Sequence, residues 1–160
     1  KNLNKSSNNC NIKDISKHTP RQSFTSWLNT LKILIQRSHL ELLFQYGYFH
    51  GNSLILEELI QPDDPFTCVG CKNSYFLIWD NDEWFIITDS YIDTIISEIG
   101  KYLVKLLVIW QKENVHRISN ESFSTYFFEN IQKTIGGKYS RTQIILNVKK
   151  TILKILKSYT

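Results

Sequence analysis

Cys68 and Cys71 are separated by two residues, which is the spacing of half a structural zinc site. Such a site normally shows a second pair of Cys or His ligands in the sequence. Cys10 and the four His are scattered along the chain instead, and a loop that turns at Gly70 explains the spacing equally well. We therefore expect no bound metal and no cofactor, and zinc on Cys68 and Cys71 stays an open alternative.

Two further segments contain residue types that bind ions or phosphates. Residues 80–83, with Asp89 and Asp93, provide several carboxylates, but a calcium loop needs ligands at fixed offsets around a central Gly. Residues 136–138 read Gly-Gly-Lys without the Gly-x-x-x-x-Gly-Lys-[Ser/Thr] frame of a phosphate loop. We expect both segments to be turns. Since no Ser/His or Cys/His/Asp arrangement indicates a nucleophile either, the sequence predicts no catalytic residues and no enzyme.

A strand–turn–strand pattern in the middle of the chain indicates the fold class. Residues 75–79 and 84–88 are rich in aromatic and β-branched types, and the four polar residues 80–83 separate them, which is typical of a β-hairpin. A helix is expected next, over residues 90–98, and then a long strand over residues 102–111 with 115–118 as its extension.

The flanking segments complete the predicted plan. Residues 53–61 and 124–131 are expected to be strands, and residues 141–159 an amphipathic helix with its lysines mostly off the apolar stripe. A helical segment is expected from Phe24, capped by Ser23. Five strands with a helix between the third and fourth predict a mainly-β OB-fold barrel over about residues 53–135, within one domain over residues 23–160. Residues 1–22 are expected to be a flexible polar tail.

Charge is strongly segregated along the chain. Residues 23–100 contain three Lys and Arg against eleven Asp and Glu, whereas residues 101–160 contain eleven Lys and Arg against three Asp and Glu. In the predicted barrel, the acidic turn at residues 80–83 lies where an OB fold usually holds nucleic acid, and it would repel a phosphate backbone. This favours an OB fold that binds proteins. No apolar run approaches the length of a membrane span, so no membrane contact is expected.

The order of these segments resembles a known family, the telomerase-recruiting OB domains. This family includes the shelterin adrenocortical-dysplasia protein, the yeast ever-shorter-telomeres subunit and the OB subunit of telomerase holoenzymes. Residues 26–33 (Ser-Trp-Leu-Asn-Thr-Leu-Lys-Ile) resemble the Trp-Ile-x-x-Leu-Ile opening of the family. Five later segments resemble, in order, its first strand, its second and third strands, its short helix and its last two strands: residues 52–61, 75–88, 91–95, 100–108 and 127–131.

The resemblance implies a non-catalytic subunit of a nuclear telomerase or telomere complex. Such a subunit docks on the telomerase reverse transcriptase and on other OB-fold subunits of the complex. It supports processivity through protein contacts, with nucleic acid bound indirectly. By position, the resemblance assigns the docking surface to Asp89, Asp93 and Glu98 and makes Trp27 a structural anchor. The family has a tight acidic cluster in a longer loop at this point, and this sequence does not.

The alternative is a protein that binds single-stranded DNA or RNA directly, or an OB subunit of another replication or ribonucleoprotein assembly. In that case Lys101, Lys105, Lys112 and Arg117 would contact phosphates, and exposed aromatic side chains would stack on bases.

Overall fold

The computed structural model describes residues 19–69 and 75–159, and within them it shows a helical protein. The described part contains six α-helices, a 3-10 turn named η2 and one three-stranded sheet. The elements follow the chain in this order: α1 (Phe24–Leu34), α2 (Arg37–Tyr46), α3 (Tyr48–Leu59), β1 (Phe66–Cys68), β2 (Phe76–Asp80), β3 (Glu83–Ile86), α4 (Asp89–Asn114), η2 (Val115–Arg117), α5 (Glu121–Ile135) and α6 (Arg141–Ser158).

The prediction of a mainly-β OB barrel is therefore wrong. Most of the expected strand over residues 53–61 lies in α3, which ends at Leu59. The strand over 102–111 lies within α4, and the strand over 124–131 lies within α5. The expected extension at residues 115–118 is the turn η2. The open three-stranded sheet, in the order β1-β2-β3, contains only two predicted strands.

Other local predictions are confirmed. The strands β2 and β3 pair in antiparallel fashion, with Asp80 opposite Glu83. Asn81 and Asp82 have φ angles of 48° and 60°, which is the left-handed geometry of a tight two-residue hairpin turn. The Ser23 side chain caps α1 by accepting a hydrogen bond from the backbone N–H of Ser26, and α6 occupies the predicted C-terminal segment.

The long helix α4 explains why the barrel does not form. Its buried side chains recur every three or four residues over its whole length, which is the period of a helix and not of a strand. They are Ile92, Ile95, Ile96, Ile99, Leu103, Leu107 and Trp110. Because this apolar stripe continues through Gly100 without interruption, the segment folds as one helix of 26 residues.

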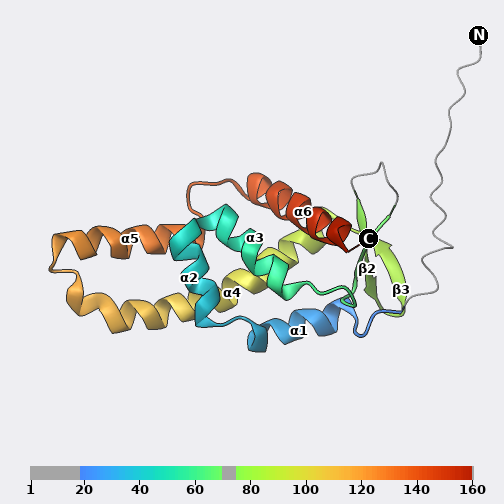
Figure 1. Ribbon diagram of the computed structural model, residues 1–160, viewed down its shortest axis with the longest axis horizontal. Helices are drawn as coiled ribbons and strands as arrows, with labels where there is room; N and C mark the ends of the chain where they lie inside the picture. The colour runs from blue at the N-terminus through green and yellow to red at the C-terminus, as the bar shows by residue number, and fades with distance from the viewer. Residues whose placement is uncertain (1–18, 70–74, 160) are drawn as a thin grey trace, which may run out of the picture.

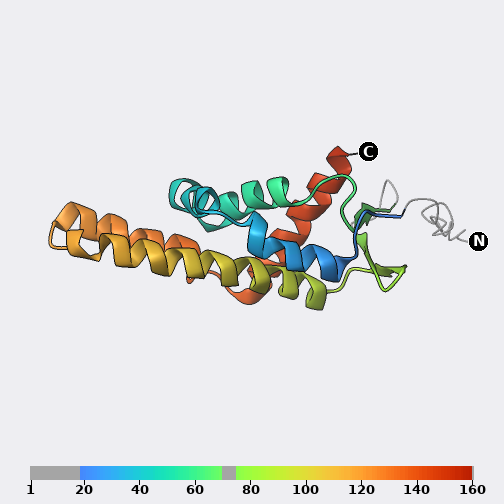
Figure 2. The same cartoon turned by 90° about the horizontal axis from the view of Figure 1, so that it is seen from below.

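Helices α4 and α5 form an antiparallel hairpin that extends away from the rest of the molecule (Figure 1). Seen from below, α1, α2 and α3 lie along one side of this hairpin, and α6 crosses near the base of it (Figure 2). The Trp110 ring joins the layers, since its centroid lies 4.8 Å from that of Phe44 in α2 and 5.1 Å from that of Phe127 in α5. The sheet lies at the end opposite the hairpin tip (Figures 1 and 2).

Candidate binding surface

The three carboxylates assigned to partner docking lie on α4, where each forms an ion pair within the chain. Asp93 Oδ1 accepts a hydrogen bond from Arg141 Nε at 2.5 Å, and Glu98 Oε2 lies 2.8 Å from Lys101 Nζ. Asp89 Oδ1 lies 4.0 Å from Lys149 Nζ. Two of these partners belong to α6, so Asp89 and Asp93 lie on the side of α4 that α6 approaches.

Glu98 lies on a different side of α4. Five residues separate it from Asp93, which corresponds to a rotation of about 140° around a helix. The predicted acidic surface is therefore divided, with Asp89 and Asp93 beside α6 and Glu98 apart from them. These pairs are largely exposed and contribute little to stability, but they lower the local negative potential that a basic partner would recognise.

The lysines assigned to the nucleic-acid alternative lie together. Lys101, Lys105 and Lys112 are all exposed, and their spacing of four and seven residues places them within about 40° of one another around α4. This sector is opposite the buried stripe that ends at Trp110. The structure thus shows a row of positive charges along the solvent face of the longest helix.

Neighbouring side chains hold two of these lysines in place. The Nζ atoms of Lys101 and Lys105 lie 4.8 and 5.3 Å from the ring centroid of Tyr102, which is cation–π geometry. The hydrogen bond to Glu98 raises the pKa of Lys101 above its usual value. This shift favours the charged form of the Lys101 ammonium.

Arg117 lies apart from this row, in η2 at the tip of the hairpin. Its guanidinium carbon lies 3.9 Å from the ring centroid of Phe123, and one terminal nitrogen donates to Asn114 Oδ1 at 3.3 Å. The structure therefore brings together three of the four predicted cations and places Arg117 beyond the end of the row.

Exposed apolar side chains run parallel to the lysine row. Val104, Val108 and Val115 are 41, 42 and 51% exposed, and their spacing of four and seven residues makes them one stripe next to the lysines. Ile135 of α5 is 48% exposed and lines a cavity together with Val104. We call these four residues, with Lys101, Lys105 and Lys112, the basic-apolar face.

The sequence interpretation missed the apolar half of this face. It treated residues 102–111 as a strand, in which side chains alternate between faces, so Val104 and Val108 would face one side and Lys105 the other. One sequence pattern could have indicated this face: Val104 and Val108 each follow a lysine, Lys101 or Lys105, by three residues. On a helix that offset places the two types side by side.

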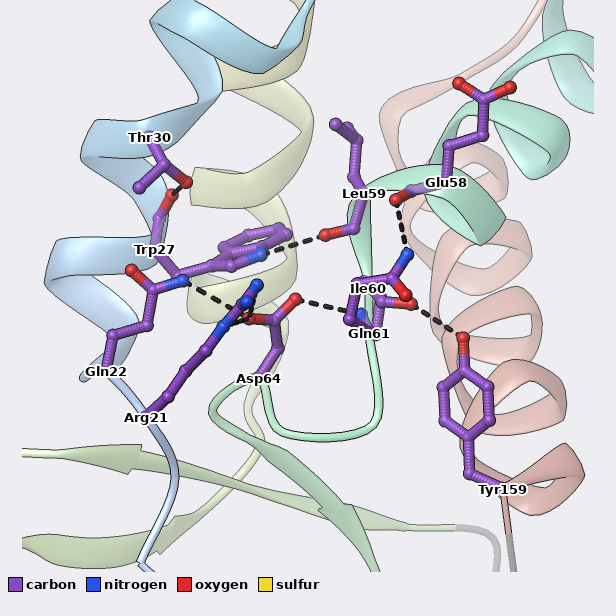
Figure 3. Close-up of polar contacts among 10 residues, drawn as sticks. All are labelled: Arg21, Gln22, Trp27, Thr30, Glu58, Leu59, Ile60, Gln61, Asp64 and Tyr159. Carbon is purple, nitrogen blue, oxygen red and sulfur yellow. Dashed lines mark hydrogen bonds and ion pairs between the residues drawn. The ribbon is translucent and has the colours of Figure 1, made fainter.

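Trp27 is fully buried and packs in the interior of the molecule. Its indole Nε1–H donates to the Leu59 carbonyl at 3.1 Å, which ties α1 to the end of α3 (Figure 3). The ring centroid lies 4.9 Å from that of Phe66. The residue therefore joins helices to the start of the sheet, and the described residues form no barrel for it to pack against.

Cys68 ends β1 and is a half-buried free thiol, while Cys71 lies outside the described residues. Among the residues that the structure describes, no group of three or more His, Cys, Asp or Glu side chains is close enough to hold a metal ion. No helix in the described ranges combines the length and the apolar character needed to cross a membrane.

Comparison with protein-family models, with curated proteins and with solved structures gave no match to this chain.

Proposed function

We propose that this chain is a non-catalytic docking protein whose basic-apolar face binds an acidic amphipathic helix of a partner protein. The observation that carries the proposal is the exposed pair Val104 and Val108 beside a row of lysines on α4, continued by Val115 at the start of η2. Exposed apolar side chains that gather on one side of a helix favour contact with another apolar surface. A helix that lays its apolar face on such a surface is a common mode of recognition.

Charge complementarity favours an acidic occupant over a second copy of this chain. Two copies would bring the lysine rows close to one another, which costs free energy. An acidic helix would place its carboxylates against Lys105 and Lys112 and its apolar residues against the valines, while Lys101 is already paired with Glu98. Nucleic acid fits this face less well, because single strands bind by stacking bases on aromatic rings and the stripe is aliphatic.

The narrower proposal of a nuclear telomerase or telomere subunit rests on the sequence resemblance alone. Most of the segments that resemble OB strands are helical in this chain, as at residues 52–59 and 100–108. The proposed docking mechanism does not need the OB fold, and partner identity would decide between telomerase and another assembly. Mass spectrometry of proteins cross-linked to Lys105 or Lys112 would test this narrower proposal.

The docking proposal can be tested with a library of helical peptides displayed on phage and selected on the purified chain. We expect enriched peptides to carry apolar residues at helical spacing with Asp or Glu beside them. Val108→Asp should reduce their binding at least tenfold, and Lys105→Glu with Lys112→Glu should reduce it and its dependence on salt.

A matched charge control is available on another surface of the molecule. Lys150 and Lys154 are exposed on α6, and Lys150→Glu with Lys154→Glu changes the net charge by the same amount. Equal loss of binding in this control would mean that overall charge, not the basic-apolar face, selects the peptides. Tight binding of a single-stranded oligonucleotide or of anionic vesicles that the Lys105/Lys112 variant abolishes would also contradict the proposal.

A further inference from the structure

A second candidate site lies between the α2–α3 turn, α5 and the segment before α6, in a pocket of about 660 Å³. The turn between α2 and α3 forms one wall, the outer face of α5 forms the floor, and the segment before α6 forms the other wall. This volume lies within the range of sites that hold small ligands. The lining combines aromatic, cationic and hydrogen-bonding side chains: Tyr48, Phe128, Glu129, Lys133, Lys138 and Tyr139.

Two glycines and a ring stack hold the walls of this pocket in place. Gly47 and Gly136 have φ angles of 82° and 64°, a conformation that glycine adopts without strain. A Cβ atom at Gly136 would lie 2.6 Å from the Tyr48 ring, so this glycine lets the tyrosine pack against the end of α5. Tyr139 stacks on Phe49 with 4.0 Å between ring centroids. The aromatic walls are therefore positioned before any ligand arrives.

The cations of the pocket are suited to a phosphate. Lys133 Nζ donates to the Phe44 carbonyl at 2.9 Å, which orients the ammonium and leaves two of its three donors for a ligand. Lys138 follows Gly136 and Gly137 in the turn before α6, and its ammonium has no partner among the described residues. The Gly-Gly-Lys sequence forms a turn, as predicted from its lack of a phosphate-loop frame, and this turn presents a lysine to the pocket.

The remaining lining groups are suited to a nucleoside. Phe128 and Tyr139 are 55% and 38% exposed, and an exposed ring provides a stacking surface for a base. The Glu129 carboxylate accepts hydrogen bonds, as from ribose hydroxyls or base amino groups. Two aromatic rings, one carboxylate and two lysines therefore match the base, the hydroxyls and the phosphate of one ligand.

We infer that this pocket binds a nucleoside phosphate, either as a free nucleotide or as one nucleotide of a single strand. The inference is independent of the docking proposal, because none of these pocket residues belongs to the basic-apolar face. The shared chemistry is a planar base joined through a sugar to a phosphate. Comparing the affinity for mononucleotides with that for an oligonucleotide distinguishes a free ligand from one in a strand.

The test is titration of the ¹⁵N-labelled chain with 5′-AMP, 5′-UMP, adenosine, inorganic phosphate and a ten-residue oligouridine, followed by NMR. We expect the amide signals of Gly47, Gly136 and Gly137 to shift with the nucleotides, and inorganic phosphate or adenosine alone to bind at least fivefold more weakly. Tighter binding of the oligonucleotide would assign the site to a strand, and tighter binding of a mononucleotide would assign it to a free ligand.

Two variants and one control decide the role of the pocket. Lys138→Gln should weaken nucleotide binding about fivefold or more, and Tyr139→Leu should weaken it about tenfold through loss of stacking. Lys150→Gln, on the exposed face of α6, should leave binding unchanged. Lys138→Gln is an exposed substitution, so it remains informative if Tyr139→Leu unfolds the turn. Absence of shifts at millimolar nucleotide, equal affinity for phosphate alone, or unchanged binding by Lys138→Gln would each overturn the inference.

Discussion

The Arg21 guanidinium donates two hydrogen bonds to one carboxylate oxygen of Asp64, through Nε at 3.1 Å and a terminal nitrogen at 3.0 Å. Gln22 donates to the same oxygen at 3.2 Å, and the backbone N–H of Gln61 donates to the other oxygen at 2.8 Å (Figure 3). The side chain of Asp64 is almost fully buried. Residues 21 and 22, which the sequence interpretation placed in a flexible tail, thus bind the loop after α3.

Asp64→Asn should destabilise the fold by about 2–4 kcal/mol, because the amide loses the charge and turns one acceptor into a donor facing other donors. Urea unfolding followed by circular dichroism measures this change. Asp63→Asn is the matched control, since Asp63 is exposed and its change should stay within about 0.5 kcal/mol. Equal effects of the two substitutions would show that the Arg21–Asp64 contact does not hold this loop.

Gly100→Ala should stabilise the chain by about 0.5–1 kcal/mol, because glycine is a poor helix former in a helix interior. A Cβ atom at this position would meet no heavy atom within 4 Å, so no clash offsets the gain. Thermal unfolding of the two proteins measures the difference. A lower melting temperature for Gly100→Ala would indicate that α4 is broken at this residue, as the sequence interpretation assumed.

The wrong prediction of a strand after Gly100 shows which part of the fold the sequence does not determine locally. The segments with strong local signals were predicted correctly, including the cap at Ser23 and the hairpin around Asn81. Seven of the ten residues after Gly100 are Leu, Val, Ile or Trp, and such a run fits a buried strand or a helix equally well. The helix is stabilised by packing of Trp110 against Phe44 and Phe127. These residues are distant in sequence, so no local pattern predicts the contact.

The candidate surfaces were predictable to a similar degree. The sequence identifies Lys101, Lys105 and Lys112 as cations. That they share one face becomes clear only when residues 89–114 are known to form a single helix. The pocket between α5 and the α2–α3 turn joins Gly47 to Lys138, more than ninety residues apart. Such a pocket forms only through tertiary packing, so the spacing of its residues along the chain does not predict it.

Asn130→Leu should stabilise the fold by about 1 kcal/mol or more. The Asn130 side chain is fully buried, and neither its Nδ2 nor its Oδ1 has a hydrogen-bond partner among the described residues. Burying unpaired polar atoms costs free energy, and an apolar side chain of similar shape avoids that cost. Asn52→Leu should act in the opposite direction, because Asn52 Nδ2 donates to the Tyr48 carbonyl at 2.7 Å. A loss of stability in both variants, measured by urea unfolding, would reveal a polar partner for Asn130.

The stability of the chain should fall as pH rises above about 10, and Tyr48 should account for part of the loss. Burial raises the pKa of Tyr48 above its usual value, and the nearby charge of Arg141 acts in the opposite direction. The folded chain therefore keeps this phenolic proton at pH values where the unfolded chain has lost it, so unfolding releases a proton and is favoured by alkaline pH.

Urea unfolding at pH 8 and at pH 11 measures this effect. The free energy of unfolding should fall more for the native chain than for Tyr48→Phe. Absorbance at 295 nm should show that the variant lacks a late-titrating phenol. An equal pH dependence of stability in the two proteins would mean that Tyr48 ionises as freely in the folded state as in the unfolded chain.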